Sequence, residues 1–229
     1  MSTGQELQTK ATRLFEGGKF EEAAEAFDAA MQAYQGEDNG ELAAEMQVNL
    51  GLARRELGDQ EAALAAMQDG LAYFREHGNQ LREAQTLGNM ALAYVKAGDH
   101  EQAETMYRDA ARIFREIEDE DSYGETILAL GDMQFRAGRL MEAVTTYEVG
   151  LDYIRDTNHR QKVIKQLLVL KSRLMGERRL GEAGGDEEAV SDSRRRRRRR
   201  RLFKRGQSEE DTDAADTPST IDEGVSDED

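Results

Sequence analysis

The sequence contains no cysteine, no tryptophan and only one proline. Without cysteine, the chain can form neither a disulfide framework nor a thiolate metal site. A single proline in 229 residues leaves long segments without the residue that most often breaks a helix. Runs of β-branched residues are also scarce, whereas Ala, Glu, Gln, Leu and Arg are abundant, and this balance favours helix over strand. We therefore expect an all-α protein with essentially no sheet.

Long apolar runs are missing as well. Residues 1–16 alternate polar and apolar side chains and lack the uninterrupted apolar stretch of a secretory signal. No window reaches the roughly 20 apolar residues that a membrane-spanning helix needs. Hydrophobic residues make up 38% of the chain, which is enough for one continuous core. We expect a cytoplasmic protein, or a nuclear one if the source is eukaryotic.

The sequence repeats itself with a period of 40 residues. The period shows first in four glycines, Gly18, Gly58, Gly98 and Gly138. Small residues keep the same spacing five residues after each glycine, at Ala23, Ala63, Ala103 and Ala143, and seven residues before it, at Ala11, Gly51, Ala91 and Gly131. A fixed period of about 20 to 50 residues predicts a stack of similar supersecondary units.

The repeated residues predict that each unit is a helical hairpin. A small residue in each of two antiparallel helices lets them approach closely, and the glycine between them makes the tight turn. Large apolar residues nine positions after each glycine would fill the groove toward the next hairpin, at Phe27, Met67, Tyr107 and Tyr147. One hairpin alone would be unstable, whereas four stacked hairpins bury a continuous core.

This spacing resembles the tetratricopeptide repeat (TPR) family, whose pattern is large-x2-Leu-Gly-x2-Tyr, then Gly, then Ala-x3-Phe/Tyr and Ala. The third unit reads Leu87, Met90, Ala91, Tyr94, Gly98, Ala103, Tyr107 and Ala110. The fourth unit reads Ile127, Leu130, Gly131, Gln134, Gly138, Ala143, Tyr147 and Gly150. The second unit departs from the pattern at Gln47 and Arg54, and the first unit at Lys10.

Two further departures occur in all four units. The tryptophan of the family is absent, and the proline that usually ends the second helix is replaced by Gln35, Arg75, Arg115 and Arg155. Without that proline the second helix can run on, which fits a period of 40 in place of the common period of about 34. In this respect the chain is similar to the extended repeats of kinesin light chains and G-protein-signalling modulators, which bind peptides.

The resemblance implies a right-handed TPR solenoid over residues 1–178, with repeats at about 4–37, 44–77, 84–117 and 124–157. We expect helices at 3–16, 19–35, 41–57, 60–77, 80–97, 100–118, 122–137, 140–156 and 159–178. The last helix continues the register at Leu167, Leu170 and Leu174, so we predict that it caps the stack. Its predicted outward side chains are basic and include Lys162, Lys165 and Lys171.

The sequence offers little support for an enzyme. His77, His100 and His159 lie near helix ends or turns of different units, and no HExxH motif or Gly-rich phosphate loop accompanies them. The many carboxylates fit a solvated helix surface better than a catalytic pair. We therefore predict no catalytic residue, no metal site, no cofactor and no small-molecule substrate.

Asparagine occupies the same place in the first helices of two successive units. Asn49 and Asn89 are equivalent, and Thr9 and Ala129 take that place in units one and four. In the peptide-binding TPR proteins that the chain resembles, asparagines here line the concave face and grip the backbone of a ligand. The alternative is an exposed asparagine, or one that bonds helix to helix. Around the two asparagines, the predicted inner surface includes Leu52, Arg55, Gln85, Leu92, Lys96, Asp132 and Arg136.

Two pairs of residues resemble ligand loops at first sight: Gly78 with Asn79, and Asn39 with Gly40. A glycine and an asparagine just past a helix are what a left-handed helix C-cap requires, so we interpret both pairs as structural. They carry no predicted binding role.

Residues 181–229 separate their charges into blocks. Apolar periodicity stops at Gly181, which predicts a disordered tail with a basic part at 194–205 and an acidic part at 206–229. The basic part could contact RNA, DNA or an anionic membrane without reading sequence, through Arg194, Arg195, Arg196, Arg197, Arg198, Arg199, Arg200, Arg201, Lys204 and Arg205. It could equally pair with its acidic neighbours, or act as a nuclear-localisation signal in a eukaryote.

Together these features favour a scaffold or adaptor that binds a partner protein or peptide on the concave surface of the repeats. The alternative is a polyanion-associated protein that acts through the arginine tract, with the helical repeats as a positioning module.

Overall fold

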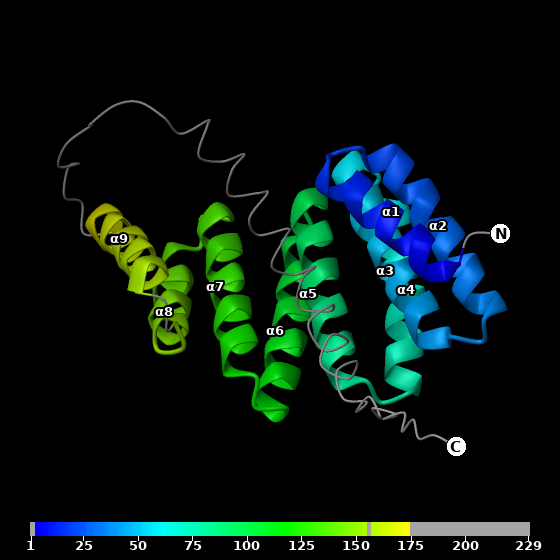
Figure 1. Cartoon of the computed structure of the whole chain (residues 1–229). Coiled ribbons are helices and arrows are strands. Elements are labelled where there is room, and N and C mark those ends of the chain that lie inside the picture. Colours follow the sequence, from blue (N-terminus) through cyan, green and yellow to red (C-terminus); the bar gives the residue numbers. More distant parts are fainter. Residues whose placement is uncertain (1–2, 155–156, 175–229) are drawn as a thin grey trace, which may run out of the picture. The chain divides into compact units, whose positions relative to one another are not determined.

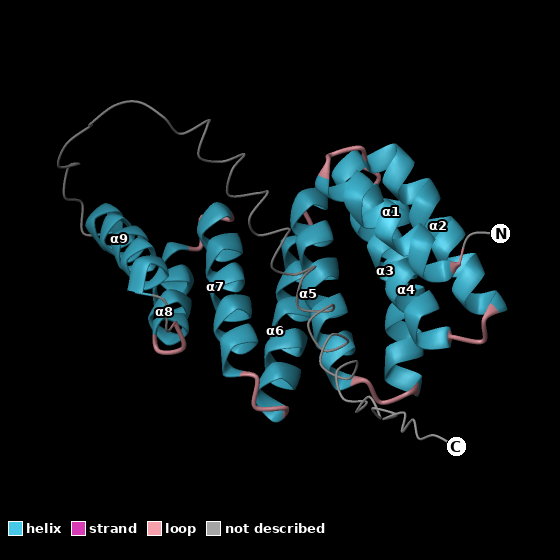
Figure 2. Ribbon diagram, in the orientation of Figure 1, coloured by secondary structure: helices cyan, strands magenta, loops and turns pink. Residues whose placement is uncertain are grey.

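The computed structural model describes residues 3–154 and 157–174. This part of the chain contains nine α-helices and no strand (Figures 1 and 2). The helices are α1 (Gly4–Glu16), α2 (Phe20–Gly36), α3 (Gly40–Leu57), α4 (Gln60–Glu76), α5 (Gln80–Ala97), α6 (His100–Glu116), α7 (Glu120–Arg136), α8 (Leu140–Leu151) and α9 (Thr157–Leu174). The all-α prediction is confirmed, whereas the predictions for the tail at 181–229 lie outside the described residues.

Within the described chain, the connections from α1 to α8 are one turn motif that recurs every 20 residues. The glycines at the turns inside the hairpins have left-handed φ angles: 79° at Gly18, 88° at Gly58, 83° at Gly98 and 77° at Gly138. The turns between hairpins contain a left-handed residue at the same place: Asp38 at 56°, Gly78 at 67° and Glu118 at 59°. The 40-residue period of the sequence therefore contains a 20-residue period of the backbone.

Each turn is closed by the same hydrogen bond. The residue after the left-handed position donates its backbone N–H to a carbonyl five residues back, as Asp59 does to Arg54 at 3.1 Å and Asp119 to Phe114 at 2.9 Å. This satisfies carbonyl groups that the end of the preceding helix leaves without a partner. The structure corrects one prediction, because the left-handed residue before α3 is Asp38, and Gly40 begins the helix.

The residue after each left-handed position also begins the next helix. At five turns its side-chain oxygen accepts a hydrogen bond from a backbone N–H three residues on, at 3.0 to 3.1 Å, with the acceptors Asn39, Asp59, Asn79, Asp99 and Asp119. Such N-caps stabilise a helix by about 0.5 to 2 kcal/mol. Lys19 and Arg139 take the corresponding places before α2 and α8 and form no such bond.

The predicted small residues lie where two helices of a hairpin meet. Ala11, Ala23, Ala63, Ala91, Ala103 and Ala143 are all 0% exposed. A Cβ atom at Gly51 would lie 2.7 Å from the Met67 Cγ atom and 2.8 Å from the Ala63 carbonyl oxygen. The distance between α3 and α4 therefore leaves no room for a side chain at this position, and the interpretation of Gly51 from sequence is confirmed.

Large residues connect one hairpin to the next. Phe27 and Met67 are 0% exposed, Tyr107 is 3% exposed and Tyr147 is 2% exposed. Tyr107 belongs to a buried cluster with Ala129, Leu130 and Met133 of α7, so this second-helix residue fills the groove toward the following hairpin. Every helix contacts the next helix along the chain, from α1 to α9.

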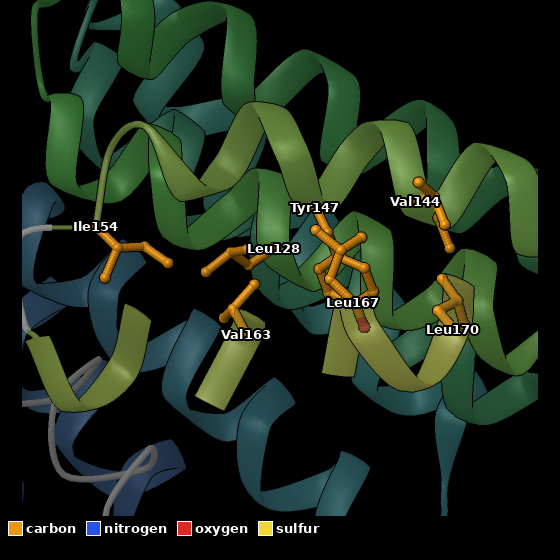
Figure 3. Close-up of a cluster of buried hydrophobic side chains, with 8 residues drawn as sticks. Leu128, Val144, Tyr147, Ile154, Val163, Leu167 and Leu170 are labelled. Atoms are coloured by element: carbon orange, nitrogen blue, oxygen red, sulfur yellow. The ribbon is translucent and has the colours of Figure 1, made fainter. Parts of the chain in front are cut away.

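Helix α9 covers the last hairpin with three of its side chains. Val163, Leu167 and Leu170 of α9 belong to a buried cluster with Leu128 of α7 and with Val144 and Tyr147 of α8 (Figure 3). The buried leucines match the register that the sequence predicts for the final helix.

Helix α8 ends five residues before its predicted end at residue 156. After Leu151, the N–H groups of Asp152, Tyr153 and Ile154 bond to carbonyls three residues back, at 3.3, 3.2 and 3.5 Å. These tighter turns end the α-helix and place Ile154, which is 9% exposed, in the cluster beneath α9. Burial of Ile154 against α9 thus accompanies the early end of α8.

An ion pair links the third hairpin to the fourth. Arg139, at the start of α8, donates to Glu104 of α6 at 2.6 Å, and Arg108 donates to the same carboxylate at 2.6 Å. Burial raises the pKa of the Glu104 carboxyl, but the hydrogen bonds and charges of Arg139 and Arg108 outweigh burial and hold the pKa below its ordinary value. The pair stabilises the junction above the acidic pH range and is lost as the pH falls through that lowered pKa.

The contact at Ala103 can be tested by adding a side chain. We expect Ala103→Arg to destabilise the protein by about 3 kcal/mol or more, because the guanidinium has no room and no partner. For a chain of this size the melting temperature should fall by roughly 10 °C. The control Thr105→Arg, on the exposed face of the same helix, should melt with the parent. If both variants melt within a few degrees of the parent, the assigned repeat register is wrong.

The left-handed Glu118 gives a prediction of the opposite sign. A non-glycine residue in this conformation costs on the order of 1 kcal/mol or more, so Glu118→Gly should raise the melting temperature by about 2 to 4 °C. The matched control is Glu25→Gly on the exposed face of α2, where glycine should lower stability by about 0.5 to 1 kcal/mol. A loss of stability at both positions would contradict the backbone geometry of the turns between hairpins.

Candidate partner-binding surface

Asn49 on α3 and Asn89 on α5 are almost completely buried. Their exposed fractions are 7% and 8%. Within the described ranges neither side-chain amide forms a hydrogen bond with another residue, and neither is sealed from solvent. Buried amides normally have partners, and a carboxamide can both donate to and accept from a single peptide unit. The two asparagines are therefore placed to bind a backbone that comes from outside the chain.

The equivalent places in the outer units differ. Thr9 of α1 is exposed, and its hydroxyl donates to the Gln5 carbonyl oxygen at 2.8 Å. Ala129 of α7 is 7% exposed and has no polar group in its side chain. The amide positions are thus confined to the two central units. A hollow on α1 next to Thr9 is lined by Glu6, Lys10, Arg13 and Leu14.

Beside the asparagines, an ion pair crosses from α5 to α3. Arg82 donates to the Glu45 carboxylate at 2.8 Å, and the two side chains are 23% and 16% exposed. Arg82 also donates to the Gln85 side-chain oxygen at 3.5 Å. The Asn79 amide donates to Glu41 at 2.7 Å and joins the same two helices. These residues fix the relative position of the helices that carry Asn49 and Asn89.

Sequence analysis missed the Arg82–Glu45 pair. The two residues are 37 positions apart and do not occupy equivalent places in the 40-residue repeat. Only the packing of successive first helices brings them together. A search for opposite charges in adjacent units, one turn off the repeat position, is the signal that could have found them.

Two predicted contact residues, Arg55 and Lys96, share one carboxylate. Both lie 3.2 Å from the Glu56 Oε1 atom, and the Lys96 ammonium also donates to the Arg55 carbonyl oxygen at 3.4 Å. The Arg55 side chain is only 8% exposed, whereas that of Lys96 is 42% exposed. The structure therefore places Arg55 in a buried ion-pair cluster between α3 and α5, while Lys96 keeps a face toward solvent.

In the fourth unit, Asp132 accepts a hydrogen bond from the Tyr147 hydroxyl. Burial, the negative charge of Asp132 and this hydrogen bond together raise the pKa of Tyr147 above its ordinary value, so the tyrosine stays a neutral donor. Asp132 is held within its own hairpin. Of the other predicted contact residues, Leu52 is buried, Gln85 and Leu92 are half-buried, and Arg136 is exposed.

The histidines that the sequence offers for chemistry have structural surroundings. The His77 ring stacks on Tyr73 with 3.9 Å between ring centroids, and its Nδ1 atom lies 2.9 Å from the Tyr73 carbonyl oxygen at the end of α4. In the ranges 3–154 and 157–174, no three His, Asp or Glu side chains are grouped to hold a metal ion. No helix in these ranges is both long and apolar enough to cross a membrane.

Comparison with known families assigns both halves of the helical region to one family. Residues 9–76 and residues 82–156 each match a tetratricopeptide repeat model, and together these matches span more than half of the chain. Tetratricopeptide repeats generally mediate interactions between proteins, and folds of this kind are typically non-enzymatic scaffolds. A search of curated proteins found no match.

Solved structures show the same fold. BtubC (BKLC) from P. vanneervenii is 16% identical and has a TM-score of 0.65, with 98% of this chain and 87% of that chain covered. A Podosopora anserina protein with nearly identical kinesin-light-chain TPR-like repeats is 14% identical, with a TM-score of 0.59 and coverage of 76% and 99%. A variant of that protein gives 14% identity, a TM-score of 0.57 and coverage of 75% and 95%. With four hairpins in one register and two family matches over them, the chain belongs to the tetratricopeptide repeat family.

Proposed function

We propose that this chain is a protein–protein interaction scaffold that holds a segment of a partner protein against its first helices, with Asn49 and Asn89 bound to the partner's backbone. The observation that carries the proposal is the pair of amides one repeat apart, each more than nine-tenths buried and without a hydrogen bond among the described residues. A buried polar group without a partner costs about 1 to 3 kcal/mol. A partner backbone that satisfies both amides removes that cost.

The surroundings of the two asparagines favour a partner segment with apolar and acidic side chains. Leu92 is half-buried beside Asn89 on α5, and Lys96 and Arg136 carry the exposed positive charge of the predicted surface. Glu45 and Asp132 are already paired, with Arg82 and Tyr147. The amides would hold the backbone without reading its sequence, whereas these side chains would select the partner. No catalytic residue and no cofactor enters the proposal.

The test is a double substitution in the full chain. A partner is first captured from a lysate of the source organism and identified by mass spectrometry, and its affinity is then measured by calorimetry. Asn49→Ala with Asn89→Ala should weaken binding on the order of tenfold, since each lost hydrogen bond is worth about 0.5 to 1.5 kcal/mol. The circular dichroism spectrum should keep its helical signal.

The matched control replaces two exposed amides of second helices, Gln32→Ala on α2 with Gln102→Ala on α6. The control should bind the partner as the parent does. If the Asn49 and Asn89 variant binds with unchanged affinity, the partner does not use the two asparagines.

A chain that ends at residue 180 separates the proposal from the polyanion alternative. This alternative rests on the arginine tract in the sequence, which lies outside the described residues. Under the scaffold proposal, the shortened chain captures the same partner with the same affinity. If capture is lost with the tail and kept in the asparagine variant, and falls steeply with salt, the arginine tract is the binding element.

A further inference from the structure

The described chain exposes its large apolar side chains mainly at one end. Met141 and Val149 on α8 are 67% and 41% exposed, and Ile164, Leu168 and Val169 on α9 are 39%, 61% and 51% exposed. The sequence predicted that the outward side chains of α9 are basic. Lys162, Lys165 and Lys171 are indeed exposed, but an apolar pair accompanies them.

The repeat register shows what normally covers this pair. Forty residues earlier, Gly124 and Leu128 take the places of Ile164 and Leu168. A Cβ atom at Gly124 would lie 2.6 Å from the Tyr153 Cβ atom, and one at Gly150 would lie 2.7 Å from the Leu128 Cδ2 atom. The equivalent face of α7 is therefore covered by the second helix of its own hairpin and the turn that follows it. In the described residues α9 has no second helix, and its own face is open.

A complete second helix does not fit on α9 in the usual way. The place of the small residue, Gly131 in the fourth unit, is taken by Lys171 in the fifth. Lys171 pairs with Glu148 of α8 at 2.7 Å, and a side chain of this size prevents the close approach seen at Gly51. Only the half of the face around Ile164 and Leu168 is accessible. The occupant should therefore be a short segment with two apolar side chains.

We propose that the face formed by Ile164 and Leu168, with Lys162 and Lys165 beside them, docks the chain's own acidic segment at residues 220–229. This segment contains five acidic residues and no basic one, whereas α9 contains five basic residues and no acidic one. Its two large apolar residues, Ile221 and Val225, are four positions apart, which is also the spacing of Ile164 and Leu168. The charges and the apolar spacing of the two segments are complementary.

Other segments of the chain fit this face less well. A second copy of α9 would bring like charges together, and so would the apolar Leu202 and Phe203, because ten basic residues surround them in the range 194–205. The acidic residues near Val190 offer a single large apolar side chain. Residues 220–229 combine the required charge with two apolar anchors.

The connection is long enough for this contact. Residues 175–219 give 45 residues between α9 and the segment, and an extended chain spans about 3.3 Å per residue, so the segment can return to α9 from any direction. Covalent attachment raises its local concentration toward the millimolar range. A contact with a dissociation constant near millimolar would then be formed about half of the time. The docked segment would cover the open end of the stack and is separate from the asparagine site.

Because the chain lacks cysteine, a single spin label can be placed cleanly. The full chain with Ser226→Cys, spin-labelled and with isoleucine methyl groups enriched for NMR, reports on Ile164 among six isoleucines. We expect the Ile164 methyl signal to lose roughly half of its intensity or more, at the occupancy that a millimolar local concentration gives. Ile113 and Ile117, at the far end of α6, should keep their signals. High salt should restore the Ile164 signal in part.

Three controls decide the outcome. Leu168→Ser should restore the Ile164 signal, whereas Val149→Ser on α8 should not. A label at Ser191→Cys, beside Val190, should have a weaker effect than the label at position 226. The proposal is overturned if Ile164 is unaffected, or if the two labels broaden it equally. It is also overturned if broadening occurs only when spin-labelled chains are mixed with methyl-enriched ones, because the occupant is then a second copy.

Discussion

The close contact between two helices at one pair of small residues is the constraint on which the rest of the structure depends. At Gly51 the neighbouring helix leaves no space for a Cβ atom, and Ala63, Ala103 and Ala143 are completely buried on the second helices. Because helices at this distance cannot shift along one another without a clash, the contact sets the register of each hairpin. Large residues such as Tyr107 then have only the groove toward the next hairpin to fill.

The same constraint produces the two surfaces to which we assign binding. Repetition of the hairpin places Asn49 and Asn89 at equivalent points of α3 and α5, and the Arg82–Glu45 pair fixes these helices beside each other. At the end of the stack the repetition stops, since Lys171 occupies the place of the small residue. Helix α9 is left with one buried face and one partly open face. A regular array thus offers partners a surface along its first helices, and its interruption exposes another.

The sequence predicted features that depend on local spacing, and failed where distant side chains meet. The small residues, the helix order and the cap at α9 follow from a 40-residue pattern that stacking requires in every unit. The left-handed Asp38 and Glu118 were missed because neither residue type marks that conformation as glycine does. The burial of Arg55 was missed because it depends on Glu56 and on Lys96 of the next unit, a pairing that no single repeat contains.

The central claim, that one hairpin contact in a 40-residue register defines the fold, is tested most directly by deleting one unit. Removal of residues 59–98 joins Gly58 to Asp99, which recreates the native glycine–aspartate turn. The shortened chain should keep its helical signal per residue and unfold in one cooperative transition. Removal of residues 59–92, the common repeat length of about 34, should give a protein without a cooperative transition. Equal folding of the two deletions, or failure of the 40-residue deletion alone, would contradict the account.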